Sequence, residues 1–152
     1  MNRDTLSATT PAPTRRWHLL AIALIAGTWM WSGLAKWSDL EGFHRALQAW
    51  DLLPTAWNWN AAHVIPRSEC LLAIAVLIPW TRRSALILSI FALLIFAIAL
   101  IIAASRGITS TCGCFGAADP FTWPWNLVRN IVLITLALWA LHHGRRTDHA
   151  SP

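Results

Sequence analysis

The chain has 152 residues, of which 56% are hydrophobic and 12% are charged, and its formal net charge is +5. Ordinary soluble domains carry about 25% charged residues, so this composition argues against a water-soluble globular protein and indicates lipid as the solvent. The basic residues are dispersed between apolar runs and form no stripe, which argues against a protein that binds nucleic acid.

Residues 1–16 are polar, include prolines and show no periodic apolar pattern. We therefore predict that they form a disordered cytoplasmic tail. The apolar run at residues 17–36 is close to the roughly 20 residues that cross the hydrocarbon core, and it predicts the first transmembrane helix. Arg15 and Arg16 precede this run and are typical of a cytoplasmic anchor, although the pair also fits a twin-arginine export signal.

Residues 38–54 predict a short amphipathic helix that lies in the membrane interface between the first and second spans. Ser38 and Glu41 fit the two ends of a capping box at its start. The apolar residues of this segment recur at helical spacing, at Leu40, Phe43, Leu47 and Trp50.

Three further apolar runs predict the remaining spans, at residues 61–80, 84–105 and 125–141. The second span is the weakest by hydropathy because it contains Pro66, Arg67 and Glu69. Residues 144–152 are polar and are predicted to be a cytoplasmic tail. The sequence thus predicts an all-α membrane protein whose four-transmembrane-helix bundle occupies residues 17–143.

The charge pattern predicts the orientation of these spans in a bacterial inner membrane. Seven of the twelve Lys and Arg residues fall in the two tails and in the loop that holds Arg82 and Arg83. Because short cytoplasmic loops carry an excess of basic residues, we expect both termini in the cytoplasm. The loops after the first and third spans then face the periplasm. A three-span alternative would place Arg82 and Arg83 outside and erase this asymmetry.

The loop after the third span carries the pair Cys112 and Cys114, separated by Gly113. The periplasm is an oxidising compartment, and Gly113 can adopt the backbone angles that a bridge across so tight a turn requires. Such a bridge is expected to be strained and therefore easily reduced. We predict a disulfide that is exchanged with other proteins. Two alternatives remain open: small residues in a packed loop, and two thiolates that handle copper or zinc.

Cys70 lies in the outer half of the second span. It is interpreted as a small buried residue, or as a resolving thiol for Cys112 or Cys114.

Charged side chains inside spans are costly and suggest function. Lys36, Glu69 and Arg129 all lie near the outer ends of their spans, so we expect them to meet beneath the Cys loop. They would form either an ion pair that fixes helix packing or a group that supports the thiols. Arg106 and Arg129 flank the loop, and a nearby cation stabilises a thiolate.

Several segments resemble, in the same order, the MauE/DoxX family of redox-associated membrane proteins. They are residues 32–54, Pro66-x-x-Glu69, the CGCFG sequence at residues 112–116, and Arg129-Asn130. The likeness covers about residues 17–141. Trp50 departs from the family pattern, which has Tyr before Leu-Leu-Pro, and Cys70 is not part of it.

The resemblance implies a four-helix bundle linked to periplasmic protein maturation and methylamine metabolism. In that family, MauE is associated with processing, transport or disulfide formation of the methylamine dehydrogenase small subunit, alongside the thioredoxin-like MauD. The leading hypothesis is a thiol–disulfide oxidoreductase that exchanges with a MauD-like partner and serves a disulfide-containing client. A quinone cofactor follows only by analogy with other membrane thiol oxidoreductases. The alternative is a non-enzymatic scaffold that docks a periplasmic partner.

Overall fold

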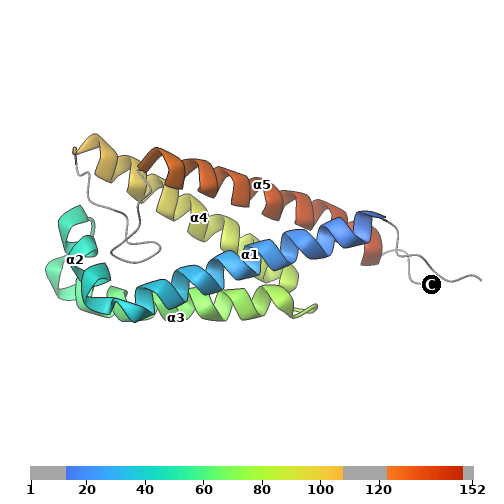
Figure 1. The fold of residues 1–152 in the computed structure, drawn as a ribbon, viewed down its shortest axis with the longest axis horizontal. Coiled ribbons are helices and arrows are strands. Elements are labelled where there is room, and N and C mark those ends of the chain that lie inside the picture. The colour runs from blue at the N-terminus through green and yellow to red at the C-terminus, as the bar shows by residue number, and fades with distance from the viewer. Residues whose placement is uncertain (1–12, 108–122, 149–152) are drawn as a thin grey trace, which may run out of the picture.

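The computed structural model describes residues 13–107 and 123–148, and within these ranges every secondary-structure element is a helix (Figure 1). The all-α prediction is therefore confirmed. The helices are α1 (Pro13–Ser38), α2 (Leu40–Trp50), α3 (Thr55–Leu77), α4 (Arg82–Ser105) and α5 (Trp123–Asp148).

Three stretches are long and apolar enough to cross a membrane, judged by length and composition: Arg16–Ser38, Arg82–Ser105 and Pro124–Gly144. They lie in α1, α4 and α5 and agree with three of the predicted spans. Large apolar side chains also cover the outer surface, where about half or more of Leu24, Leu88 and Leu138 is exposed. An apolar exterior of this kind is typical of a protein whose solvent is lipid.

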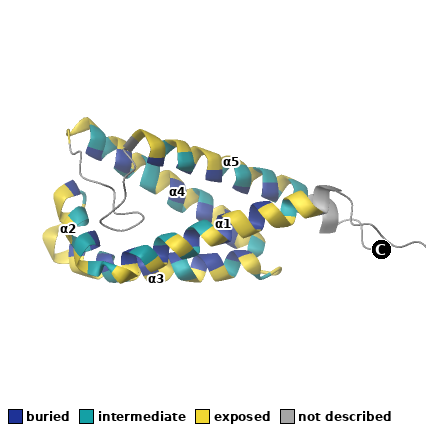
Figure 2. Cartoon of the chain, viewed as in Figure 1, coloured by how far each residue is buried: buried dark blue, intermediate teal, exposed yellow. Residues whose placement is uncertain are grey.

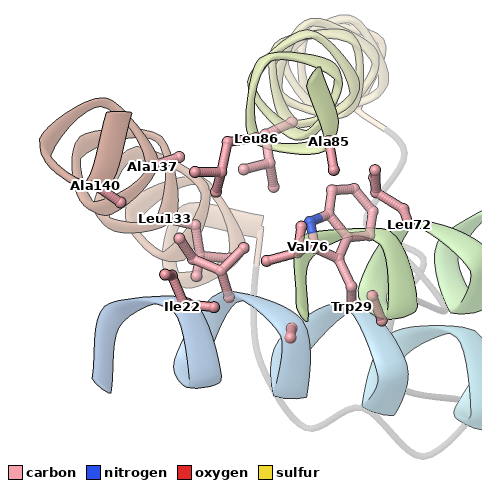
Figure 3. Close-up of a cluster of buried hydrophobic side chains, with 13 residues drawn as sticks. Ile22, Trp29, Leu72, Val76, Ala85, Leu86, Leu133, Ala137 and Ala140 are labelled. Carbon is pink, nitrogen blue, oxygen red and sulfur yellow. The ribbon is translucent and has the colours of Figure 1, made fainter. Parts of the chain in front are cut away.

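The helices form an elongated bundle in which α1 packs along α3 and α4 packs along α5, while α2 lies across one end (Figure 1). Each long helix turns one face inward and the opposite faces outward (Figure 2). The main core lies away from α2 and joins all four long helices, with Ile22, Val76, Leu86 and Leu133 pointing toward one another (Figure 3). Alanines between them let the helices approach closely.

The helices are longer than the apolar runs that predicted them. α1 begins at Pro13, so residues 13–16 are helical and do not belong to a disordered tail, and α5 continues to Asp148, beyond the predicted start of the polar tail. α3 begins at Thr55, ahead of the predicted residue 61. The physical reason is that hydropathy marks only the part of a helix that meets lipid, whereas backbone hydrogen bonding continues through polar turns. Residues 1–12 and 149–152 lie outside the described ranges.

The helix predicted after the first span is present as α2, but its N-cap is Asp39 and not Ser38. Because α1 runs through Ser38, the Ser38 hydroxyl donates back to the carbonyl of Ala35 at 2.8 Å. Asp39 Oδ1 instead accepts from the backbone N–H of Gly42 at 2.9 Å, which satisfies one of the amide groups left open at a helix start. α2 buries Phe43 and Trp50 against the rest of the bundle.

Candidate functional site

The predicted redox pair, Cys112 and Cys114, lies outside the described residues. The structure does describe the helix ends on either side of it, since α4 ends at Ser105 and α5 begins at Trp123. Both ends lie at the α2 end of the bundle (Figure 1).

A buried ion pair joins α1 to α3 at the same end of the bundle. Lys36 Nζ donates to Glu69 Oε1 at 2.8 Å and to Oε2 at 2.9 Å, and the two side chains are only 1% and 3% exposed. Ser32, one turn before Lys36, accepts a third hydrogen bond from the ammonium group at 2.5 Å and also hydrogen-bonds Glu69. All three hydrogens of the ammonium group are therefore used.

The close approach of α1 and α3 makes this pairing possible. A Cβ atom placed on Gly33 would lie 2.6 Å from Cys70 Sγ and 2.9 Å from the carbonyl oxygen of Pro66, so only glycine fits at this contact. Pro66 lies inside α3 and is buried. Cys70 is half-buried and carries a free thiol that packs against Gly33. This position agrees with a small packing residue, and its role as a resolving thiol stays a prediction.

Beside the ion pair is a polar cavity of about 30 Å³, which is large enough for a water molecule. Arg129, Asn126 and Asn130 contribute its polar wall from α5, and Arg129 interacts electrostatically with both Lys36 and Glu69. The structure thus brings the three predicted charges, Lys36, Glu69 and Arg129, to one cavity. Their functional role stays a prediction.

Aromatic rings close this polar cavity on the side of α2 and α4. The Lys36 ammonium lies over the rings of Phe43 and Phe96, at 5.6 and 5.7 Å from their centroids, and a ring face stabilises a cation. Trp50 lines the cavity from the C-terminal end of α2. Phe43 and Trp50 belong to the apolar face that the amphipathic pattern of α2 predicted, and both are buried.

Some members of the site were not predicted from the sequence. Ser32 and Asn126 precede Lys36 and Arg129 by one helical turn, and this spacing on one helix face was the available signal. Arg106 was expected to act on the thiols. In the structure its guanidinium donates to the carbonyl oxygens of Trp50 at 3.3 Å and Asp51 at 3.2 Å, so it ties the end of α4 to the end of α2.

Within residues 13–107 and 123–148, no three His, Cys, Asp or Glu side chains gather as a metal site. The copper or zinc alternative concerns Cys112 and Cys114 and stays a prediction.

Comparison with known proteins gives the family of this chain. The family described as "Methylamine utilisation protein MauE" matches residues 14–143. The chain belongs to the MauE family. It is 33% identical over 110 residues to the methylamine utilization protein MauE of Paracoccus denitrificans, covering 70% of this chain and 59% of that protein. The corresponding protein of Paracoccus versutus is 30% identical over 126 residues, covering 81% of this chain and 67% of that protein.

The chain therefore matches about three fifths of the length of the Paracoccus denitrificans protein. No solved structure matches it. Its apolar helices and its membership of the MauE family identify it as a membrane protein. Two segments that carried the resemblance to the MauE family meet at the buried ion pair, since one holds Ser32, Gly33 and Lys36 and the other holds Pro66 and Glu69.

Proposed function

We propose that this chain is a four-span protein of the bacterial inner membrane, with both termini in the cytoplasm and the Cys loop in the periplasm. Of the four long helices, α3 is the one that hydropathy does not identify as a membrane span. Its 23 residues extend roughly 34 Å at the helical rise, enough to cross the hydrocarbon core. Its charge at Glu69 is neutralised by Lys36 within the bundle, and Leu71, Ile74 and Leu77 are about half or more exposed on its outer face.

In this orientation α2 lies at the periplasmic interface, as an amphipathic helix should. Its buried face holds Phe43 and Trp50, and the neighbouring turn of α3 presents the exposed rings of Trp57 and Trp59. Trp side chains favour the headgroup level of a bilayer. These aromatic residues support an interfacial position for α2.

We infer that the chain is a membrane thiol–disulfide component that supports the maturation of periplasmic proteins. Cys112 and Cys114 would pass their disulfide to the dithiol of a thioredoxin-like partner, leaving the pair as two thiols and the partner oxidised. No further oxidant is needed for that exchange. The observation that carries the proposal is that a charged cavity lies near the end of α4 and the start of α5, the two helix ends that the Cys loop joins: Leu100 and Asn126 line it within two turns of those ends.

The cavity supports thiol chemistry through its charges. Arg129 lies two turns inside α5, and a cation near a cysteine favours the reactive thiolate form. The pair of Lys36 and Glu69 holds α1 and α3 in place around the cavity. These three residues are therefore assigned a supporting role, and the covalent chemistry is assigned to the two cysteines of the loop.

The pathway is proposed from the two Paracoccus relatives, which are methylamine utilization proteins. A partner with a thioredoxin-like fold and a client with disulfide bonds would complete this pathway. We place the chain upstream of the client, as the component from which the partner receives the disulfide that it passes on to the client.

Trapping of mixed disulfides tests the thiol–disulfide function. In Cys112→Ser, the thiolate of Cys114 can attack the disulfide of an oxidised partner, which releases one partner thiol, but no neighbouring thiol remains to break the new bond, so a mixed disulfide with the periplasmic partner should accumulate on non-reducing gels. Cys114→Ser should give the reciprocal result. The double variant should trap nothing. Cys70→Ser is the matched control and should behave as wild type. Full maturation activity in the double variant would exclude the proposed chemistry.

A non-enzymatic scaffold is a second candidate, favoured by the exposed aromatic cluster at the α2 end. Trp59 lies between His44, which it meets edge to face at 5.1 Å, and His63, whose ring is tilted against it at 4.7 Å, both measured between ring centroids. Arg67 lies over Trp37 at 5.0 Å. If this cluster docks a partner, Trp59→Ala should weaken co-purification of the partner while the double Cys variant still binds it. The opposite result would favour the redox function.

A further inference from the structure

The helix α2 covers the polar cavity but is a separate piece of the bundle. The single residue Asp39 lies between α1 and α2, and residues 51–54 lie between α2 and α3. Of the 11 residues of α2, only Phe43 and Trp50 are buried. The main core, as far as the structure describes it, contains no residue of α2. This helix therefore packs against the end of the bundle through a small part of its surface (Figure 1).

The contacts that hold the C-terminal end of α2 centre on Trp50. Its ring packs with Leu100 and Ala103 of α4. Arg106, just after α4, donates to the carbonyl oxygens of Trp50 and Asp51. Trp50 and Leu100 also line the polar cavity. The ring that attaches α2 to α4 is thus the ring that closes the cavity at this end.

The closed position of α2 leaves one polar group of Trp50 unsatisfied. The side chain is only 7% exposed, and within the part of the chain that the structure describes its indole N–H has no hydrogen-bond partner. Burying a donor without an acceptor costs free energy, whereas a ring in contact with water would regain an acceptor. This cost opposes the apolar contacts of the ring and makes it easier to lift.

We propose that α2 is a lid on the polar cavity, and that its C-terminal end swings away from α4 to let water reach Lys36 and Glu69. Segments with few buried apolar contacts open most readily. Asp39 is the hinge, because the bond from its carboxylate to the N–H of Gly42 lies within the moving piece. The motion follows from these contacts alone. Only its direction, toward the periplasm, rests on the orientation proposed above.

The two positions of the lid differ in what surrounds the ion pair. With the lid closed, the side chains of Lys36 and Glu69 are 1% and 3% exposed, and the exclusion of water strengthens the attraction between their charges. With the lid open, the pair meets solvent and can exchange protons with it. The cavity of about 30 Å³ admits molecules of the size of water.

Cysteine accessibility in the purified full chain tests the lid. Leu100→Cys places a thiol beneath the Trp50 ring. Leu93→Cys is the matched control, since Leu93 is also buried and lines the same cavity but lies two turns farther along α4, in the main core. Both are made in a chain with Ser in place of its three native cysteines, Cys70, Cys112 and Cys114.

The measurement is the rate at which a water-soluble methanethiosulfonate modifies each thiol in detergent micelles, followed by the mass of the intact protein. We expect the Leu100→Cys thiol to react at least roughly tenfold faster than the Leu93→Cys thiol. Lifting the Trp50 ring uncovers the first position, whereas the main core still covers the second.

Two changes should move the lid in opposite directions. Arg106→Ala removes a contact that holds α2 closed and should speed modification of the Leu100→Cys thiol about fivefold. Replacement of Trp50 by β-(3-benzothienyl)alanine keeps the shape of the ring but removes its N–H. It should slow modification about fivefold, because the closed position then buries no unsatisfied donor. Neither change should alter the rate for the Leu93→Cys thiol.

Ala103→Cys is a second reporter for the case that Leu100→Cys does not fold, because it adds one sulfur at another position under the Trp50 ring. Equal rates at the reporter and at the Leu93→Cys thiol would overturn the proposal. So would a reporter rate that either change leaves unaltered, or a rise with Arg106→Ala that is the same at both positions. No step of this experiment needs Cys112 or Cys114, so its outcome is separate from that of disulfide trapping.

Discussion

The side chain of Lys36 is almost fully buried, yet three hydrogen bonds and two aromatic rings surround its charge. Removing a charge from water is costly, and the cost is offset only when the partner geometry is good. The bidentate contact with Glu69 meets that condition. The two residues are 33 positions apart in the chain, so their pairing links α1 to α3 and helps to define how these helices sit against each other.

The first prediction concerns this pair. Lys36→Met should lower the free energy of unfolding by about 3–5 kcal/mol, because it leaves the Glu69 carboxylate buried without its cation. The double variant Lys36→Met/Glu69→Leu should recover most of the loss. Unfolding in detergent micelles, followed by circular dichroism, measures both. Arg83→Met, which removes an exposed charge, is the control and should change stability little.

The second prediction concerns Gly33. Gly33→Ala should destabilise the bundle by about 1–3 kcal/mol through overpacking, because the new Cβ would press on Cys70 Sγ and on the backbone oxygen of Pro66. Gly27 lies in the same helix and has no atom within 4 Å of an added Cβ. Gly27→Ala should therefore be neutral or slightly stabilising.

Thermal unfolding of the two glycine variants under identical conditions measures the difference. The combination Gly33→Ala/Cys70→Ala should regain part of the lost stability, because it removes the sulfur from the contact. Equal melting temperatures for Gly33→Ala and Gly27→Ala would contradict a close approach of α1 and α3 at this point.

At the scale of elements, α2 is the piece that covers the polar cavity. It is anchored at both ends, by the Asp39 cap at its start and by Arg106 at its finish. Asp51, its C-cap, adopts a left-handed backbone conformation with φ of 48°, which Asp tolerates better than most residues. The amphipathic pattern predicted the helix, and the Asp39 cap is local to it, whereas the anchor at Arg106 depends on the neighbouring end of α4.

The third prediction tests the anchor at Arg106. Arg106→Ala should release the C-terminal end of α2 and speed amide hydrogen exchange there about fivefold, since one net hydrogen bond is worth about 1 kcal/mol. Exchange in α5 should stay unchanged. Arg83→Ala is the control. If amide exchange at the C-terminal end of α2 is no faster in Arg106→Ala than in the wild type, the contact does not hold α2.

At the scale of the whole molecule, the arrangement of charges and helices supports an even number of spans. α1 and α3 lie side by side and so do α4 and α5, which places the starts of α1 and α4 at one end of the bundle (Figure 1). Arg16 and Arg82 begin the apolar stretches at that end. In the proposed orientation this end faces the cytoplasm, where the positive-inside rule expects basic residues.

The fourth prediction tests this topology through α3. In a background without native cysteines, a single cysteine at Thr55 should react with a membrane-impermeant maleimide in intact cells, and one at Thr81 should react only after the membrane is opened. The two positions bracket α3. Identical labelling of both would mean that α3 does not cross, and the four-span arrangement would fall.

The helical class follows from the sequence alone, because an apolar run of about twenty residues has one stable solution in lipid. The sequence also determined α2 through its periodicity and singled out Lys36, Glu69 and Arg129, since charges inside apolar helices are rare. It did not determine where the helices end, because polar turns continue a helix beyond the lipid-facing run.

How the helices face one another could be known only from the folded arrangement. The contact of Gly33 with Pro66 and Cys70, the capping of α2 by Arg106 and the packing of Trp50 with Leu100 all join residues that are distant in the chain. Periodicity reports which face of a helix is apolar, and almost every face of a membrane helix is apolar. The rotation and spacing of the helices follow instead from side-chain size and from the need to pair buried charges.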